Sequence, residues 1–108
     1  MGKHPRPART ESTVNVSHLT GRRRGAIVKE EVVQRGNEVL KYSLAYINPR
    51  ICAVDNGRVL GYDNSHGRHH RHYMGQVSSV KFPGYEAHVE RLRQEVSELW
   101  RHEDEQKR

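Results

Sequence analysis

The clearest chemical signal in this sequence is a histidine-rich segment. Four of the eight histidines of the chain fall between residues 66 and 72, and two arginines lie among them (His66, Arg68, His69, His70, Arg71, His72). Histidine changes its protonation state near neutral pH and so acts as a general acid or base. Arginine binds phosphate oxygens through two donors at once. The segment therefore indicates proton transfer beside a phosphate group.

Cleavage of RNA without a metal ion requires these side chains. A base removes the proton of the 2′-hydroxyl, an acid protonates the leaving 5′-oxygen, and cations stabilise the charge that develops on the phosphorane. We assign His70 and His72 as acid and base, with Arg71 holding the phosphate. His66 is expected to support this catalytic group from the preceding loop. Arg68 and His69 are expected to contact the RNA.

The alternation of an extended chain divides this segment between two faces. Successive side chains of a strand point to opposite sides, so His70 and His72 would share one face. His69, Arg71 and Tyr73 would then share the other face. Arg71 therefore points away from the histidine pair unless the backbone turns.

Other functions of the segment stay open. His70 and His72 on one strand face, with His66 or Asp63 as a third ligand, form an arrangement that also suits Zn²⁺. Asp63 is either a turn residue or the carboxylate that orients an imidazole. A solvated basic loop without chemistry is a further interpretation. We favour a reaction that needs neither metal nor cofactor.

Composition limits the class of protein. The chain has 108 residues, enough for one small domain, and a net charge of +6, which favours a polyanionic partner. The single cysteine, Cys52, excludes an internal disulfide and is expected to be a buried thiol. No stretch has the apolar length of a membrane helix, so we expect a soluble cytoplasmic protein without membrane contact.

The first 23 residues differ from the rest. They contain Pro5 and Pro7, end in a basic run that continues into the next residue (Arg22, Arg23, Arg24), and have few apolar residues and no clear period. Only 33% of the whole chain is hydrophobic, which favours one segment without a packed core. We expect residues 1–23 to form a flexible basic arm that adds RNA phosphate contacts.

Residues 24–102 are predicted to form a single α+β domain, followed by a charged tail at residues 103–108. A richness in β-branched residues predicts a strand at 26–34, and alternating apolar residues predict a second strand at 38–47. Asn56-Gly57 predicts a type I′ hairpin over residues 51–63, in which Asp55 faces Arg58. Residues 69–74 supply a fourth strand.

A long amphipathic helix is predicted over residues 85–102. Its apolar residues recur at spacings of four and three and form one stripe (Tyr85, Val89, Leu92, Val96, Leu99). The predicted fold is thus a small four-stranded antiparallel sheet (β-β-β-β-α) that the long C-terminal helix covers on one face.

The pattern resembles a known family. Tyr62-Asp63-Asn64, Gly67, His69-His70-Arg71-His72, Phe82 and the C-terminal helix are similar to the TumE-like toxin components of bacterial type II toxin–antitoxin systems. Lys41 to Tyr46 resembles that family's second strand. The similar part spans about residues 24–102, without the arm.

The resemblance implies a small toxin that acts on RNA in the broad manner of RelE-type endoribonucleases. It also implies a cognate antitoxin, expected to be a helix-turn-helix protein. Two rival functions remain: a nucleic-acid-binding or regulatory module without catalysis, whose binding weakens steeply with salt, and a metal-dependent or nucleotide-transferring enzyme. The sequence makes no prediction of oligomeric state.

Overall fold

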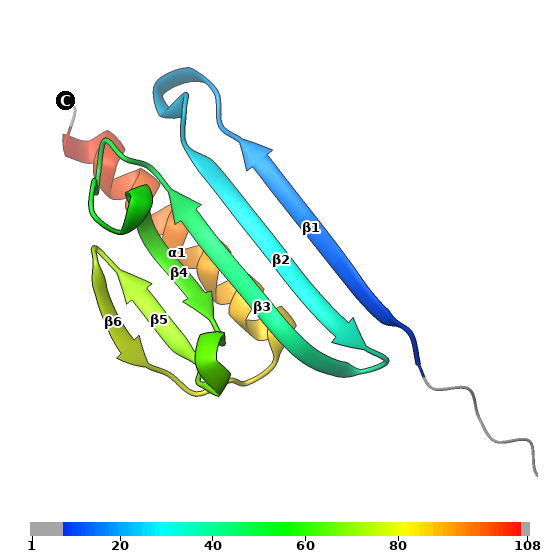
Figure 1. Ribbon diagram of the computed structural model, residues 1–108. Coiled ribbons are helices and arrows are strands. Elements are labelled where there is room, and N and C mark those ends of the chain that lie inside the picture. Colours follow the sequence, from blue (N-terminus) through cyan, green and yellow to red (C-terminus); the bar gives the residue numbers. More distant parts are fainter. Residues whose placement is uncertain (1–7, 107–108) are drawn as a thin grey trace, which may run out of the picture.

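The computed structural model describes residues 8–106 as one antiparallel sheet and one helix (Figure 1). The strands are β1 (Thr10–His18), β2 (Ile27–Arg35), β3 (Glu38–Ile47), β4 (Arg58–Asp63), β5 (His70–Tyr73) and β6 (Gln76–Ser79), and the helix is α1 (Tyr85–Gln106). Each strand pairs with the next one along the chain. The predicted α+β class is confirmed, but the sheet has six strands rather than four.

The centre of the sheet follows the alternation of the sequence. Gly36 takes a left-handed backbone conformation (φ 58°) in the turn that joins β2 to β3, where glycine has no steric penalty. Tyr42, Leu44 and Tyr46 of β3 are each at most 1% exposed. Their common face is the one that α1 covers, as the alternation predicts.

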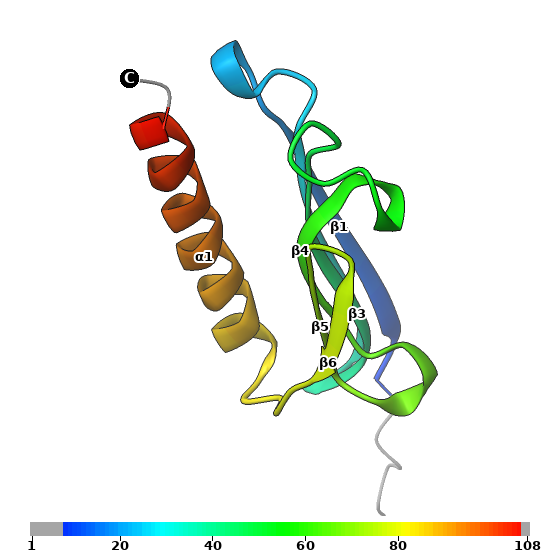
Figure 2. The same cartoon turned by 90° about the vertical axis from the view of Figure 1, so that its left-hand side faces the viewer.

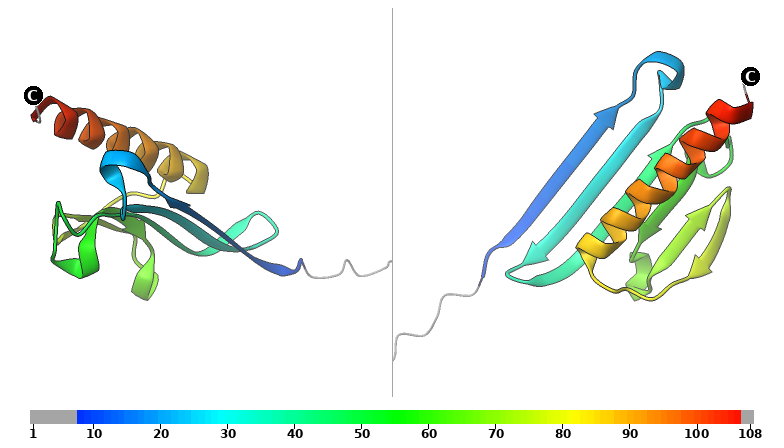
Figure 3. Two further views of the ribbon diagram at one scale, coloured as in Figure 1. Left: turned by 90° about the horizontal axis from the view of Figure 1, so that it is seen from above. Right: turned by 180° about the vertical axis from the view of Figure 1, so that it is seen from behind.

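The helix lies on one face of the sheet, over β3 and β4 (Figures 2 and 3). Val89, Leu92 and Val96 are buried there, which confirms the predicted stripe. His88 is also fully buried, although its polar ring was not expected in the core. The helix continues to Gln106, so part of the predicted tail is helical; residues 107–108 lie outside the described residues.

The predicted hairpin at Asn56-Gly57 is wrong. Residues 51–54 form no strand, and β4 pairs with β3 instead, from Ser43 opposite Asp63 to Ile47 opposite Arg58. This pairing buries the apolar side chains of β4 between two neighbouring strands and α1, which a local two-stranded hairpin cannot do. Asp55 still forms an ion pair with Arg58, at 2.7 Å, but within the turn.

The two strands missing from the prediction lie at the edges of the sheet. β1 falls inside the segment expected to be a flexible arm, so that prediction does not hold for residues 10–18, and residues 1–7 lie outside the described residues. β6 falls between the predicted fourth strand and the predicted helix, where no element was expected. Every residue of both strands is exposed, so backbone pairing with β2 and β5 holds them rather than an apolar face. Within residues 8–106, no helix has both the length and the hydropathy to cross a bilayer.

Candidate active site

A hollow of about 500 Å³ lies on the face of the sheet opposite α1. Two loops project from that face in Figure 2, one between β3 and β4 and one between β4 and β5. Glu31 of β2 lines the hollow. The other charged and imidazole side chains that line it come from β3, β4, the β4–β5 loop and β5 (Lys41, Arg58, Asp63, His66, His70, His72). The hollow thus brings together three of the four residues assigned to catalysis from the sequence.

Strand β5 presents two histidines to this hollow. His70 pairs with Asp63 across the ladder and His72 pairs with Gly61, and both imidazoles lie on the open face with ring centroids 6.3 Å apart. Arg71, between them, points to the other face. The predicted division of the segment between two faces is therefore confirmed.

Arg71 belongs to a different cluster, under the helix. Its guanidinium forms an ion pair with Glu95 of α1 and donates to the hydroxyl of Tyr62 at 3.2 Å. The Tyr62 hydroxyl donates in turn to Glu95. Burial, the hydrogen bond from Tyr62 to Glu95 and the charge of that carboxylate raise the pKa of Tyr62 and outweigh Arg71 and Arg91. Arg71 is thus occupied on the helix side, away from the hollow.

His66 reaches the hollow from a short turn, η3 (Ser65–Gly67). Its backbone is left-handed, with φ 61°, a conformation that turns the chain sharply between β4 and β5. Asp63 stabilises the start of this turn, because its Oδ1 accepts a hydrogen bond from the Ser65 amide at 3.2 Å. His66 remains exposed to solvent.

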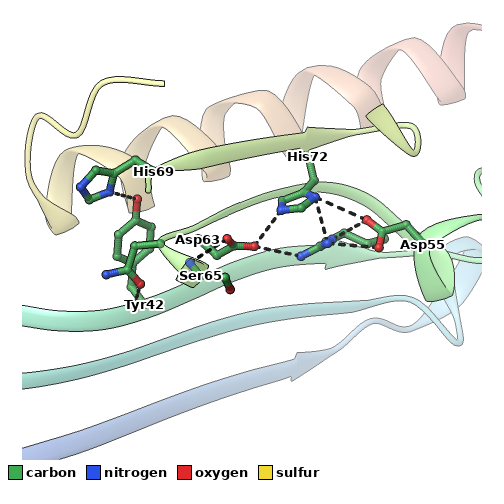
Figure 4. Close-up of polar contacts among 8 residues, drawn as sticks. Tyr42, Asp55, Asp63, Ser65, His69 and His72 are labelled. Atoms are coloured by element: carbon green, nitrogen blue, oxygen red, sulfur yellow. Dashed lines mark hydrogen bonds and ion pairs between the residues drawn. The ribbon is translucent and has the colours of Figure 1, made fainter. Parts of the chain in front are cut away.

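Arg58 organises the centre of the hollow. Its guanidinium donates to both carboxylate oxygens of Asp55, at 2.7 and 3.1 Å, and to Oδ2 of Asp63 at 3.3 Å. It also lies 2.9 Å from Nδ1 of His72. Figure 4 shows His72 between the two aspartates. Only 20% of the Arg58 side chain is exposed, so solvent screens these contacts poorly.

These contacts determine the tautomer of His72. Arginine has donors only, so Nδ1 of His72 must accept the hydrogen bond from Arg58 and carries no proton. The proton of the neutral ring is then on Nε2, which lies 2.8 Å from Oδ2 of Asp63 without the alignment of a good hydrogen bond. Nδ1 of His72 therefore accepts from Arg58, while Nε2 faces Oδ2 of Asp63 without a hydrogen bond, so the ring lies between these two side chains.

Gly61 gives Arg58 its path across the sheet. A Cβ at Gly61 would lie 2.8 Å from Cδ of Arg58 and 2.7 Å from the carbonyl oxygen of Leu44. Both separations are too short for a side chain. The absence of a side chain at this position lets the Arg58 stem lie flat between two strands and reach His72.

His66 and His70 are the free imidazoles of the hollow. Among residues 8–106, no side chain or backbone group forms a hydrogen bond with either ring. The fixed charges that line the hollow cancel, since Lys41 and Arg58 face Glu31 and Asp63.

The side chains expected to bind RNA are more dispersed. His69 faces the helix side, where it stacks on Phe82 with ring centroids 4.5 Å apart and its Nδ1 lies 2.7 Å from the Tyr42 hydroxyl. Burial, together with the charge of Asp63, raises the pKa of Tyr42 to about 12, so this hydroxyl stays protonated. In Figure 4 the Tyr42–His69 pair lies apart from the network of His72.

The arginine run joins β1 to β2 near the end of α1. Arg23 is held there by Asp104, at 2.9 Å, and its guanidinium lies over the Trp100 ring, 4.9 Å from the centroid. Arg22 and Arg24 are exposed, as is Arg68 beside the hollow. Arg23 is thus the half-buried member of the run, and the exposed Arg22 also lies 3.9 Å from Asp104.

The sequence did not single out Arg58 as a functional residue. Its signal was the pair of opposite charges at Asp55 and Arg58, which we read as a cross-strand contact of a hairpin. Asp63 was correctly considered as a partner of an imidazole, and that imidazole is His72. Within residues 8–106, no three His, Cys, Asp or Glu side chains gather in a way that could hold a metal ion.

Comparison with known proteins identifies the family. The model of the family described as Toxin TumE matches residues 4–100. The match begins 20 residues before the similarity expected from the motifs and includes β1. Searches of curated proteins and of solved structures find no match. Because the family model covers most of the chain, including all six strands and most of α1, the chain belongs to the TumE toxin family.

Proposed function

We propose that this toxin is an endoribonuclease that cleaves RNA in the hollow without a metal ion. The observation that carries the proposal is the convergence of two unoccupied imidazoles, His66 and His70, with Lys41 and the anchored Arg58. One imidazole removes the proton of the 2′-hydroxyl as its oxygen attacks phosphorus. The other donates a proton to the departing 5′-oxygen. The products are a 2′,3′-cyclic phosphate and a 5′-hydroxyl.

The proposed catalytic residues differ from those predicted from the sequence. His70 and His72 were the predicted acid and base, and Arg71 the phosphate ligand. Nδ1 of His72 already accepts from Arg58, and its buried Nε2 faces Asp63, so His66 takes its place in the proposal. His72 acts as a positioning residue, and Arg71 has no direct role.

The charge distribution supports RNA binding on this face. Helix α1 carries seven acidic and three basic side chains, whereas the chain before it carries 14 basic and six acidic ones. A polyanion is therefore attracted to the sheet rather than to the helix.

The test is cleavage of RNA by the purified chain in the presence of EDTA. We expect His66→Gln and His70→Gln each to lower the rate constant by 10²-fold or more, roughly the contribution of one general acid or base. His102→Gln is the matched control, because His102 is exposed near the end of α1. A 2′-deoxynucleotide at the cleaved position should block the reaction, since it lacks the attacking oxygen.

The outcomes separate the proposal from its rivals. Cleavage with a bell-shaped pH dependence that either glutamine variant abolishes would support it. Salt-sensitive binding without new RNA ends would show a binding module instead, and a requirement for added metal would show a different enzyme class. The family implies an antitoxin partner, for which we propose a helix-turn-helix protein encoded by an adjacent gene.

A further inference from the structure

Within residues 8–106, strand β1 is a long edge strand that pairs with β2 on one side and with no strand on the other. Its nine residues pair with β2 in an unbroken register, from Thr10 opposite Arg35 to His18 opposite Ile27. The strand contains no proline, lysine or bulge, which are the usual devices that prevent pairing of an exposed edge. Its free edge is therefore competent to bind another strand.

The amino-acid composition of β1 is unusual for a strand whose side chains are all exposed. Thr13, Val14 and Val16 are β-branched residues that favour strands, yet all nine residues of β1 are exposed. Val14 and Val16 are 51% and 47% exposed. A strand that buries no side chain gains little from apolar residues unless a further strand covers them.

From these features we infer that two copies of the chain associate through antiparallel pairing of their β1 strands, centred on Val14. In this register Val14 faces Val14 of the second copy, Ser12 faces Val16, and Thr13 faces Asn15. Glu11 faces Ser17 and Thr10 faces His18, so no two like charges are opposed. The strand is thus complementary to itself.

The register also keeps the two faces of the sheet distinct. Side chains of directly paired residues lie on the same face of a sheet. Val14 pairs with Glu31, and Glu31 pairs with Ser43, which lies on the open face because its neighbours on β3 face the helix. The residues of β1 with even numbers therefore lie on the open face. Pairing centred on Val14 joins even residues to even residues. The four valines of the two strands then meet on the open face, and both α1 helices lie on the opposite face of a continuous twelve-stranded sheet.

The family match supports β1 as part of the domain. The match starts at residue 4, so the strand belongs to the family pattern and is not an appendage. The inference does not depend on the proposed RNA cleavage, since it uses neither the hollow nor its histidines.

A charge exchange at the centre of the register tests the inference. Val14→Lys places two lysines directly opposite each other, at about 4.5–5.5 Å between Cβ atoms, and Val14→Glu does the same with two glutamates. We expect the wild type to have twice the chain mass in light scattering after gel filtration. Each variant alone should have the mass of one chain, and an equimolar mixture of the two should recover the double mass.

The control is Val77→Lys on β6, the other edge of the sheet, where the valine is 58% exposed. This variant should retain the double mass. Circular dichroism and thermal unfolding of each variant establish that it is folded. A wild type that stays a single chain at high concentration, a Val14→Lys variant that still associates, or a mixture that fails to recover would each overturn the inference. Loss of antitoxin binding in Val14→Lys, with a single-chain wild type, would assign the edge to the antitoxin instead.

Discussion

Replacement of His88 by leucine is expected to stabilise the protein. The His88 ring is fully buried and stacks on Tyr62 at 4.8 Å, with Phe82 at 5.3 Å and Tyr42 at 5.7 Å. Neither ring nitrogen forms a hydrogen bond. A neutral imidazole therefore hides one donor and one acceptor from water, at a cost of about 1–3 kcal/mol each.

Leucine has a similar volume and no polar atom. It also favours a helix by a few tenths of a kcal/mol over histidine. The loss of aromatic contacts offsets about 0.5–1.5 kcal/mol of this gain. At the low end of these ranges, we expect His88→Leu to raise the free energy of unfolding by at least about 1 kcal/mol, which corresponds to roughly 4–8 °C in the melting temperature of a domain of this size.

Urea and thermal unfolding followed by circular dichroism measure this effect. His102→Leu is the control on the exposed side of the same helix, and its free energy of unfolding should change by less than about 0.5 kcal/mol. A His88→Leu variant that unfolds at a lower temperature than the wild type would show that the ring contributes more contact energy than its hidden polar atoms cost. That result would refute the reasoning.

The same residue should make stability depend on pH. Burial lowers the pKa of His88 below its ordinary value near 6.5, and the charges of Arg91 and His69 lower it further. Below pH 6.5 the unfolded chain binds a proton that the folded chain does not, so stability falls as pH falls toward the folded pKa. Above pH 6.5 this contribution is absent. The gap in stability between His88→Leu and the wild type should widen on acidification, by at most about 1.4 kcal/mol per pH unit.

Two further changes test the contacts on either side of the sheet. Gly61→Ala places a Cβ against a main-chain oxygen of β3 and the stem of Arg58. In urea unfolding it should lower the free energy of unfolding by about 1–3 kcal/mol. In an RNA assay it should reduce any cleavage by the folded fraction. Glu95→Ala removes the partner of the buried Tyr62 hydroxyl and should lower the melting temperature by roughly 5–15 °C, whereas the exposed Glu98→Ala should change it little.

Sequence patterns predicted the elements that bury one regular face. The helix and β3 each have an apolar period that matches burial against the other, and β5 divides its histidines as a strand must. His88 was missed because it lies beside Val89 at the margin of the stripe, where a polar residue usually faces water. The period identifies a buried face but not every residue at its margin.

The errors arose where local chemistry competed with distant pairing. Asn56-Gly57 is a strong turn signal for a local hairpin. Pairing with β3 instead places β4 inside the sheet and under α1, which buries more apolar surface than the hairpin would. β1 and β6 bury no side chain in the single chain, because ladder hydrogen bonds hold them, so burial left no pattern to detect. For the same reason the hollow was predicted only in part: its histidines are close in sequence, but the contact of His72 with Arg58 spans 14 residues.

The order of the elements along the chain has a consequence for synthesis. All strands that form the hollow precede α1, and each pairs with its neighbour in the chain, so the sheet can begin to form early on the ribosome. Its central side chains, such as Tyr46, Leu60 and Tyr62, nevertheless remain uncovered until residues 85–106 have emerged. A nascent chain is therefore a sheet with an exposed apolar face, prone to aggregation and open to capture by chaperones. Docking of α1 onto β3 and β4 is therefore the step that covers this apolar face.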